Sequence, residues 1–223
     1  MTDPVTALRE ILGPKGWLSG TDAKPYQRDW LNRYGVAPLG VARPANTAEV
    51  AAVVKACRMA GLAVIPQGGN TGLCGGAVAD RASAVIVSLS RMTAIGEPDP
   101  ESGSIAVDAG VVLAALHDVL EPHGLMFPMH LGAEGSARIG GLIGTNAGGS
   151  QAFRYGMMQD LVLGLEIVTP DGAMWEAFAR CRRTMPAISC ASCSAGPKAR
   201  SASSRALSSG SIPPQNNRRA RFW

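Results

Sequence analysis

The distribution of hydrophobic positions along the chain predicts helices and short strands that alternate. Hydrophobic residues recur at helical spacing in 4–12, 47–60 and 111–123. Strands are expected at 41–44, 63–66, 84–89 and 161–169, and a further strand is expected to begin at 174–176. A turn at 98–103 predicts a hairpin over 95–108, whereas 22–39 shows no clear period and is expected to be irregular. Because strands and helices alternate, the pattern indicates an α/β or α+β fold.

Residues 41–66 predict a strand, helix, strand unit. Asn46-Thr47 offers an N-cap for the helix, Glu49 falls in its first turn, and Gly61 ends it. The following run, 84–89, is continuously apolar and is expected to be buried on both faces of a sheet. The loop after 63–66 would then lie beyond the carboxyl end of a strand, where ligands of such sheets commonly bind.

That loop, residues 66–77, reads PQGGNTGLCGGA and holds five glycines within nine residues. Glycine tolerates positive φ, which costs other residues about 1–2 kcal/mol, so successive amides could turn toward one phosphate or pyrophosphate. The loop lacks both the Lys-Ser/Thr of a Walker motif and the Rossmann glycine spacing. A glycine-rich turn without a ligand remains an alternative for this loop taken alone.

A second glycine-rich region, residues 132–150, reads GAEGSARIGGLIGTNAGGS. Ile139, Leu142 and Ile143 are core-type residues placed between its glycines. We therefore expect a loop that leads into a short helix whose backbone packs tightly against a ligand or a neighbour. A long ligand with a diphosphate in its middle would explain both glycine-rich regions.

Composition narrows the class of protein. The chain has 223 residues, 46% of them hydrophobic, which is enough for a buried core. No apolar run reaches the roughly 18 residues of a membrane span. The N-terminus reads as an amphipathic helix rather than a signal peptide, so a cytoplasmic location with cysteines as thiols is expected.

The net charge of +4 arises from one end of the chain. Residues 177–223 contain nine basic and no acidic side chains, whereas 1–176 contain 12 basic and 17 acidic ones. The basic segment lacks the interleaved aromatic residues typical of nucleic-acid-binding arms. We therefore expect no nucleic-acid partner and no membrane span, and the sequence leaves the oligomeric state open.

Several separated motifs resemble the FAD-binding domain of the vanillyl-alcohol oxidase (PCMH-type) flavoproteins, in their D-2-hydroxyacid dehydrogenase branch. They are 66–77, 124–149 (GLMFPMHLGAEGSARIGGLIGTNAGG), Arg154-Tyr155-Gly156 and 161–172 (LVLGLEIVTPDG). The resemblance covers about 25–176 and implies an α+β fold in which two α/β subdomains clasp an extended FAD. It suggests an N-terminal lead-in at 1–34, the FAD-binding domain at 35–176, and a separate segment at 177–223.

Position by position, the resemblance assigns cofactor contacts to both glycine-rich regions. Those expected to wrap the pyrophosphate are Pro66, Gly68, Gly69, Asn70, Thr71, Gly72 and Leu73. Those expected to line the second loop are Ala133, Gly135, Ser136, Ile139, Gly140, Gly141, Thr145, Asn146, Gly148 and Gly149, with Glu166, Ile167 and Val168 along the adenosine end. Some relatives attach flavin through a histidine near the place of Asn70, so non-covalent FAD is expected here.

The resemblance also implies a C-terminal substrate domain that is absent from this chain. In the family that domain supplies substrate-binding arginines, the catalytic base and metal-ligand histidines. The complete enzyme would move a hydride from a small D-2-hydroxy acid to the flavin. We therefore assign no catalytic residue and no metal ligand, with His117 and His123 interpreted as surface or packing residues and His130 as a residue that could approach the flavin. The alternative is a non-catalytic FAD-binding subunit that needs a separate partner.

Residues 177–223, called the tail below, are rich in Ser, Ala and Arg and lose hydrophobic periodicity, so we expect disorder. Cys190 and Cys193 have redox-motif spacing without the strand-to-helix context that such a site needs. With GC-rich codons, a shift of one nucleotide turns this stretch into one that resembles the next family segment, including an EGTLG motif. The sequence therefore suggests a frameshift near residues 178–182, either natural or from sequencing.

Overall fold

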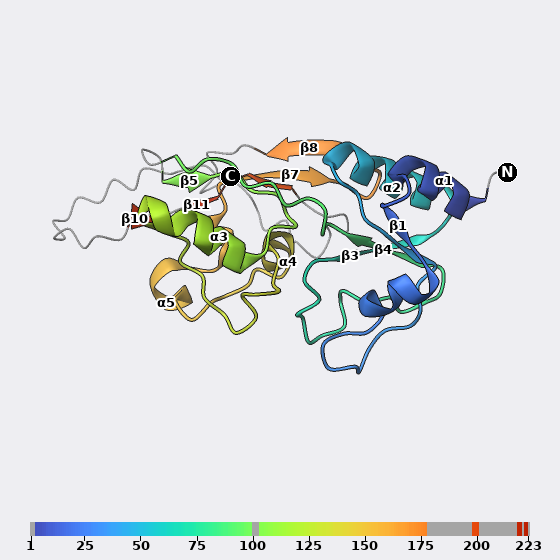
Figure 1. Cartoon of the computed structure of the whole chain (residues 1–223), viewed down its shortest axis with the longest axis horizontal. Coiled ribbons are helices and arrows are strands. Elements are labelled where there is room, and N and C mark those ends of the chain that lie inside the picture. The colour runs from blue at the N-terminus through green and yellow to red at the C-terminus, as the bar shows by residue number, and fades with distance from the viewer. Residues whose placement is uncertain (1–2, 100–102, 178–197, 201–217, 220, 223) are drawn as a thin grey trace.

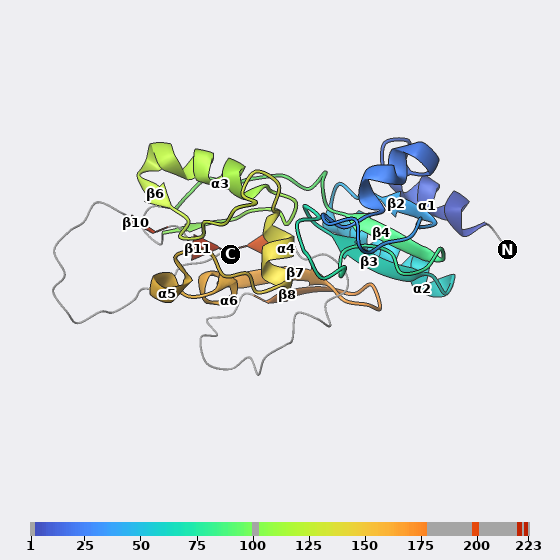
Figure 2. The same cartoon turned by 90° about the horizontal axis from the view of Figure 1, so that it is seen from below.

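The computed structural model describes residues 3–99, 103–177, 198–200, 218–219 and 221–222. Figures 1 and 2 show two lobes side by side. The α2 lobe contains α1, α2 and the sheet of β1 to β4, and the α3 lobe contains α3 to α6 with β5 and β6. This mixed α and β architecture in two parts confirms the predicted fold class.

The sheet of the α2 lobe has the strand order β1-β2-β4-β3. β2 (Gly40–Ala42), β4 (Ala84–Ser88) and β3 (Ala63–Gln67) are parallel, and β1 (Trp17–Leu18) is antiparallel to β2. The predicted strand, helix, strand unit is therefore present, with β4 inserted between its two strands. Because β3 and β4 are parallel and in register, their carboxyl ends lie at the same edge of the sheet.

β4 is the centre of this sheet, and all five of its residues are buried. Val85 and Val87 pack into a cluster with α1 (Pro4–Leu12) and α2 (Thr47–Met59), whereas Ile86 faces a second cluster on the other side. The prediction of a strand buried on both faces is confirmed. The second cluster includes Ala23 from a 3-10 helix, η1 (Gly20–Tyr26), so the expectation of irregular structure was wrong at the start of 22–39.

The start of α2 has the cap that the sequence predicts. The Asn46 Oδ1 atom accepts a hydrogen bond of 2.9 Å from the backbone N–H of Glu49. In return, the Glu49 carboxylate accepts one of 2.8 Å from the N–H of Ala45. One N–H group that a helix start would otherwise leave unpaired is satisfied in this way, and the N–H of Ala45, just before the N-cap, is paired as well.

The α3 lobe is built around α3 (Leu113–Leu120) and the 3-10 turn η2 (Glu121–His123). Its core combines α3 with β5 (Ser104–Ile105), β6 (Leu125–Met126) and α4 (Ile139–Gly144). The bridges Ile95↔Val107 and Asp99↔Ser104 confirm the predicted hairpin. Two short helices, α5 (Ala152–Tyr155) and α6 (Met158–Leu161), follow α4.

An antiparallel pair, β7 (Gly164–Val168) and β8 (Met174–Ala177), connects the lobes. Leu165 packs against the core of the α3 lobe, whereas Val168 belongs to the core around α2. Figure 1 shows this pair running along one side of both lobes. β7 therefore helps to fix the two lobes relative to each other.

Three short strands of the tail pair with this framework. β9 (Lys198–Arg200) is antiparallel to β7, β10 (Arg218–Arg219) is parallel to β6, and β11 (Arg221–Phe222) is parallel to β5. The rest of the tail, with Cys190, Cys193 and the expected frameshift position, lies outside the described residues. Among the helices that the structure describes, none combines the length and apolarity that crossing a membrane would require.

Candidate functional site

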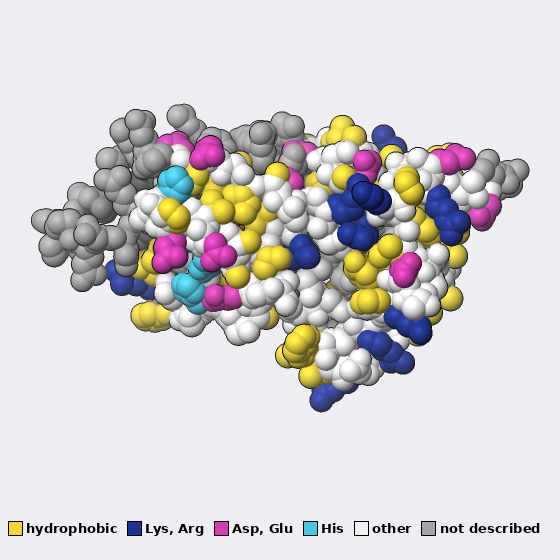
Figure 3. Space-filling model, in the orientation of Figure 1, with side chains coloured by type: hydrophobic (Ala, Val, Ile, Leu, Met, Phe, Trp, Pro, Cys, Tyr) yellow, Lys and Arg dark blue, Asp and Glu magenta, His cyan; other side chains and the backbone are white. Residues whose placement is uncertain are grey.

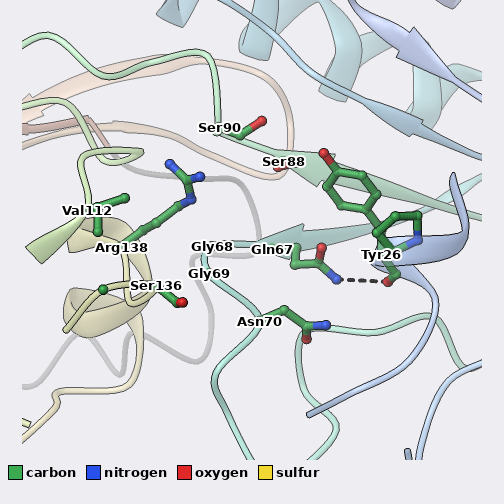
Figure 4. Close-up of a pocket in the computed structure, with 12 residues that line it drawn as sticks. Tyr26, Gln67, Gly68, Gly69, Asn70, Ser88, Ser90, Val112, Ser136 and Arg138 are labelled. Carbon is green, nitrogen blue, oxygen red and sulfur yellow. Dashed lines mark hydrogen bonds between the residues drawn. The ribbon is translucent and has the colours of Figure 1, made fainter. Parts of the chain in front are cut away.

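A cavity of about 290 Å³ is bordered by residues of both lobes. Figure 4 shows Tyr26, Gln67 and Asn70 on one side of it and Ser136 and Arg138 on the other. Its lining consists of Pro25, Tyr26, Gln67, Gly68, Gly69, Asn70, Ser88, Ser90, Val112, Gly135, Ser136 and Arg138. Residues of the first and of the second glycine-rich loop therefore line the same cavity.

The two glycine-rich loops touch through their backbones. A Cβ atom added to Gly69 would stand 1.8 Å from the carbonyl oxygen of Ser136, a separation that no real side chain can adopt. A Cβ added to Gly68 would be 3.5 Å from the Gly141 backbone, which is ordinary contact. Glycine at position 69 is thus required by the close approach of a second backbone.

Positive φ is not the reason for most glycines in the first loop. Only Asn70 (φ 54°) and Gly75 (φ 72°) adopt it between residues 66 and 77. The expectation that the loop glycines serve by adopting positive φ was therefore wrong except at Gly75. Asn70, rather than a glycine, adopts the left-handed backbone conformation at this point of the loop, because its short side chain tolerates that conformation.

Hydrogen bonds hold the α2-lobe side of the cavity in place. The Gln67 side-chain amide donates to the carbonyl oxygens of Tyr26 (3.0 Å) and Ala77 (2.7 Å). The Asn70 side-chain amide donates to the carbonyl oxygen of Arg28 at 2.6 Å. These bonds tie the glycine-rich loop to the end of η1 and to the residues just after it.

Two buried oxygen atoms at the cavity have no hydrogen-bond partner within the described part of the chain. They are Oγ of Ser88, at the carboxyl end of β4, and Oδ1 of Asn70. Buried polar atoms are normally paired, and an unpaired one costs about 1–3 kcal/mol. A ligand with polar groups would satisfy these atoms.

Arg138 is the only charged residue among the twelve that line the cavity. Its guanidinium donates to the carbonyl oxygen of Gly110, which holds the side chain along the α3-lobe wall. Burial lowers the pKa of Arg138 from its usual value, yet an arginine remains a cation at neutral pH. One fixed cation among backbone amides and neutral polar groups suits an anion such as a phosphate.

The lining offers little for acid–base chemistry. It contains no histidine, carboxylate, lysine or cysteine, and the phenol of Tyr26 is its only ionisable side chain besides Arg138. His130 does not line the cavity, and neither His117 nor His123 does. The described residues around this cavity can therefore bind and orient a ligand more readily than they can move protons.

The structure brings only part of the predicted cofactor contacts to the cavity. Gly68, Gly69, Asn70, Gly135 and Ser136 line it. The remaining predicted positions lie elsewhere: Pro66, Thr71, Gly72, Leu73, Ala133, Ile139, Gly140, Gly141, Thr145, Asn146, Gly148, Gly149, Glu166, Ile167 and Val168. The side chains of Ile139, Ile167 and Val168 are buried in the core, so only their backbones could contact a ligand.

Sequence reasoning missed seven of the lining residues. They are Pro25, Tyr26, Gln67, Ser88, Ser90, Val112 and Arg138. Ser88 and Ser90 could have been found, because they end the apolar run of β4 at the same sheet edge as the glycine-rich loop. Arg138 could also have been found as the one basic residue inside the second loop. Tyr26 lies in a segment without periodicity and gave no such signal.

Comparison with known proteins agrees with this geometry. The model of the FAD binding domain family matches residues 38–177. A probable mitochondrial D-2-hydroxyglutarate dehydrogenase of Oryza sativa subsp. indica is 39% identical over 183 residues, which are 82% of this chain and 33% of that protein. A D-2-hydroxyglutarate dehydrogenase of Xanthomonas citri pv. viticola is 39% identical over 184 residues, or 79% of this chain and 38% of that protein.

A putative mitochondrial D-lactate dehydrogenase of Schizosaccharomyces pombe is 36% identical over 187 residues, covering 80% of this chain and 35% of its own length. The chain thus spans about a third of the length of these curated relatives.

Solved structures share the fold. Alkyldihydroxyacetonephosphate synthase superposes with a TM-score of 0.71 at 19% identity over 79% of this chain and 34% of its own. Phl p 4, a grass pollen allergen with glucose dehydrogenase activity, superposes with a TM-score of 0.68 at 19% identity over 78% and 37% of the two chains. The family model matches most of the chain, the relatives are 36–39% identical to it, and a cavity lies between its two glycine-rich loops. The chain therefore belongs to the PCMH-type FAD-binding domain family.

Proposed function

We propose that residues 35–176 are the FAD-binding part of an oxidoreductase that acts on a small D-2-hydroxy acid. The observation that carries this proposal is the contact of the two glycine-rich loops at a cavity whose only charged group is Arg138. The relatives named as D-2-hydroxyglutarate and D-lactate dehydrogenases support the substrate class.

The residues present fit the pyrophosphate of FAD. Gly68, Gly69 and Gly135 present backbone without side chains, and Asn70 and Ser136 add polar groups. Arg138 supplies a positive charge, and a charge-assisted hydrogen bond from it would contribute about 1.5–3 kcal/mol. Flavin, when bound, supplies the electron chemistry of the reaction.

FAD is proposed to bind non-covalently. Asn70 stands near the place where the resemblance puts a flavin-linking histidine in some relatives, and an amide nitrogen is not a nucleophile. The lining residues of the described cavity also include no cysteine. The test is to reconstitute the chain with FAD, denature it and filter it: free flavin in the filtrate agrees with the proposal, and flavin retained on the protein contradicts it.

The chain is proposed to be inactive by itself. A dehydrogenase of this kind needs a base for the substrate hydroxyl, and the cavity lining supplies no carboxylate or histidine for that task. Reconstituted protein should keep its flavin absorbance when D-2-hydroxyglutarate or D-lactate is added without oxygen. Bleaching of the flavin by either acid would refute this part of the proposal.

The same missing base favours a second possibility, a non-catalytic FAD-binding subunit. It requires that a separate polypeptide restore substrate-dependent bleaching and that the gene encode no family segment downstream. A frameshift at the start of the tail predicts the opposite, namely family-like sequence in a second reading frame. Sequencing the gene from independent template distinguishes the two. We retain the cytoplasm as the proposed location, although two of the relatives above are named as mitochondrial.

A further inference from the structure

His117, His130 and Glu134 lie together in the α3 lobe, outside the cavity lining. One possible metal-ligating atom from each of the three side chains falls within 4.8 Å of the other two. The His117 and His130 rings have their centroids 4.6 Å apart. Figure 3 shows histidine and acidic side chains close together on the lobe that contains α3. We propose that these three residues form a binding site for a divalent transition-metal ion of the zinc type.

His117 is prepared as a ligand. Its Nε2 atom is buried and has no hydrogen-bond partner among the residues that the structure describes. The ring also forms a hydrogen bond with the backbone of Met129, which the other nitrogen, Nδ1, must supply. Metal-bound histidines commonly donate their second ring N–H to a backbone carbonyl, which leaves the ligating nitrogen unprotonated and oriented.

The other two residues complete an acceptor set. His130 Nδ1 and Glu134 Oε1 are 3.0 Å apart, and the same oxygen accepts the N–H of Leu131 at 3.0 Å. Within the described part of the chain, this hydrogen bond pairs His130 Nδ1 with Glu134 Oε1, whereas His117 Nε2 has no partner. A metal ion could take one ligand atom from each of the three side chains, in place of the hydrogen bond between His130 and Glu134.

The spacing suits zinc. Ligand atoms bound at about 2.0–2.1 Å in a tetrahedral site lie about 3.3 Å from one another. The three atoms therefore need to close by at most about 1.5 Å, which rotation of partly exposed side chains can supply. Two imidazoles and one carboxylate are ligands that zinc accepts, and three protein ligands leave a fourth position open.

The carboxylates of Glu134 and Asp118 lie close enough to the His117 ring to act on it electrostatically, and they would also attract a cation. The ion would fasten the 129–134 segment to α3, immediately before the Gly135 and Ser136 positions of the cavity.

The test measures Co²⁺ and Zn²⁺ binding to the whole chain without a histidine tag. Cys74, Cys181, Cys190 and Cys193 are replaced by serine in every protein, because thiolates also bind these metals. We expect one equivalent of Co²⁺ to produce visible d–d absorption, with Zn²⁺ displacing it. His117→Gln and His130→Gln should each weaken Zn²⁺ binding by at least about tenfold, since even residues behind metal ligands have effects of that size.

His123→Gln is the matched control, because His123 lies at the end of η2 and outside the cluster. It should bind Co²⁺ and Zn²⁺ as the parent does. Glu134→Gln keeps the shape of the side chain and is included as a ligand variant that is expected to fold. Circular dichroism checks the fold of each protein. The proposal is overturned if the parent binds no stoichiometric Co²⁺, if folded His117→Gln binds as tightly as the parent, or if His123→Gln weakens binding equally.

Discussion

Gly69 and Gly72 are three positions apart in one loop, yet their surroundings differ completely. The space for a Cβ at Gly69 is occupied by the Ser136 carbonyl, whereas nothing lies within 4 Å of the corresponding position at Gly72. Neither residue has positive φ, so backbone conformation does not distinguish them. The role of a glycine in this loop therefore depends on what faces it across the gap between the loops.

Gly69→Ala should separate the two loops, and Gly72→Ala should be tolerated. Because the obstacle at Gly69 is backbone, the loop must shift, and we expect a loss of about 1–3 kcal/mol in the free energy of unfolding. FAD affinity should fall as well. Urea unfolding and flavin titration of both variants check this prediction. Equal behaviour of the two alanine variants would contradict it.

Cys57 and Cys74 should differ in reactivity. Burial raises the pKa of the Cys57 thiol to about 11, so only about one molecule in a thousand carries the thiolate at pH 8. Cys74 is exposed. Brief treatment of the native chain with iodoacetamide, followed by mass spectrometry, should label Cys74 and spare Cys57 until denaturant is added. Labelling of both at similar rates in native conditions would show that the α2 core is not closed.

At the scale of the elements, the α2 cap is where sequence and structure agree most closely. The Asn46 side chain accepts a hydrogen bond from the N–H of Glu49, and the Glu49 side chain accepts one from the N–H of Ala45. The helix start is therefore fixed locally and does not depend on distant packing. Such a feature should have a measurable and separable contribution to stability.

Asn46→Ala should lower the free energy of unfolding by about 1 kcal/mol, because the first turn of α2 loses its acceptor. Met59→Ala is the control at the other end of the same helix, since that side chain is 89% exposed. It should change stability little. Thermal and urea unfolding of both proteins measure the difference, and a Met59→Ala effect as large as that of Asn46→Ala would argue against the capping explanation.

Local patterns predicted most elements but not how distant ones meet. The cap at Asn46, the burial of β4 and the position of the first loop after β3 all follow from neighbouring residues. The insertion of β4 between β2 and β3 and the contact of Gly69 with Ser136 depend on residues far apart in sequence. Tyr26 reaches the cavity only because η1 covers the sheet. A 3-10 helix that contains a proline has no hydrophobic periodicity by which the sequence could predict it.

The arrangement of the chain in two lobes creates a cavity between them, and Arg138 is the one charged residue in the lining of that cavity. Arg138 comes from the α3 lobe, whereas Gln67 and Asn70 come from the α2 lobe. An anion bound between these residues would contact both lobes at once. The proposed cofactor would therefore also stabilise the position of one lobe relative to the other.

Arg138→Ala should weaken FAD binding by about 10- to 150-fold, the range that corresponds to a lost charge-assisted hydrogen bond of about 1.5–3 kcal/mol. Arg138→Lys keeps the charge and should lie between this variant and the parent. Arg81→Ala is the control, because Arg81 is an exposed cation paired with Asp80 at 2.8 Å. Fluorescence titration with FAD compares the three. An Arg81→Ala loss equal to that of Arg138→Ala would indicate a general effect of charge.

The most direct test of the account compares FAD with riboflavin as ligands of the intact chain, followed by flavin fluorescence. Riboflavin carries the same ring system without the pyrophosphate, so it lacks the group that the glycine-rich loops and Arg138 are proposed to hold. We predict saturable binding of FAD, no saturation by riboflavin over the same concentrations, and loss of FAD binding in Gly69→Ala but not in Gly72→Ala. Failure to bind FAD, or binding of riboflavin as tightly as FAD, would contradict the assignment of this cavity as a pyrophosphate site.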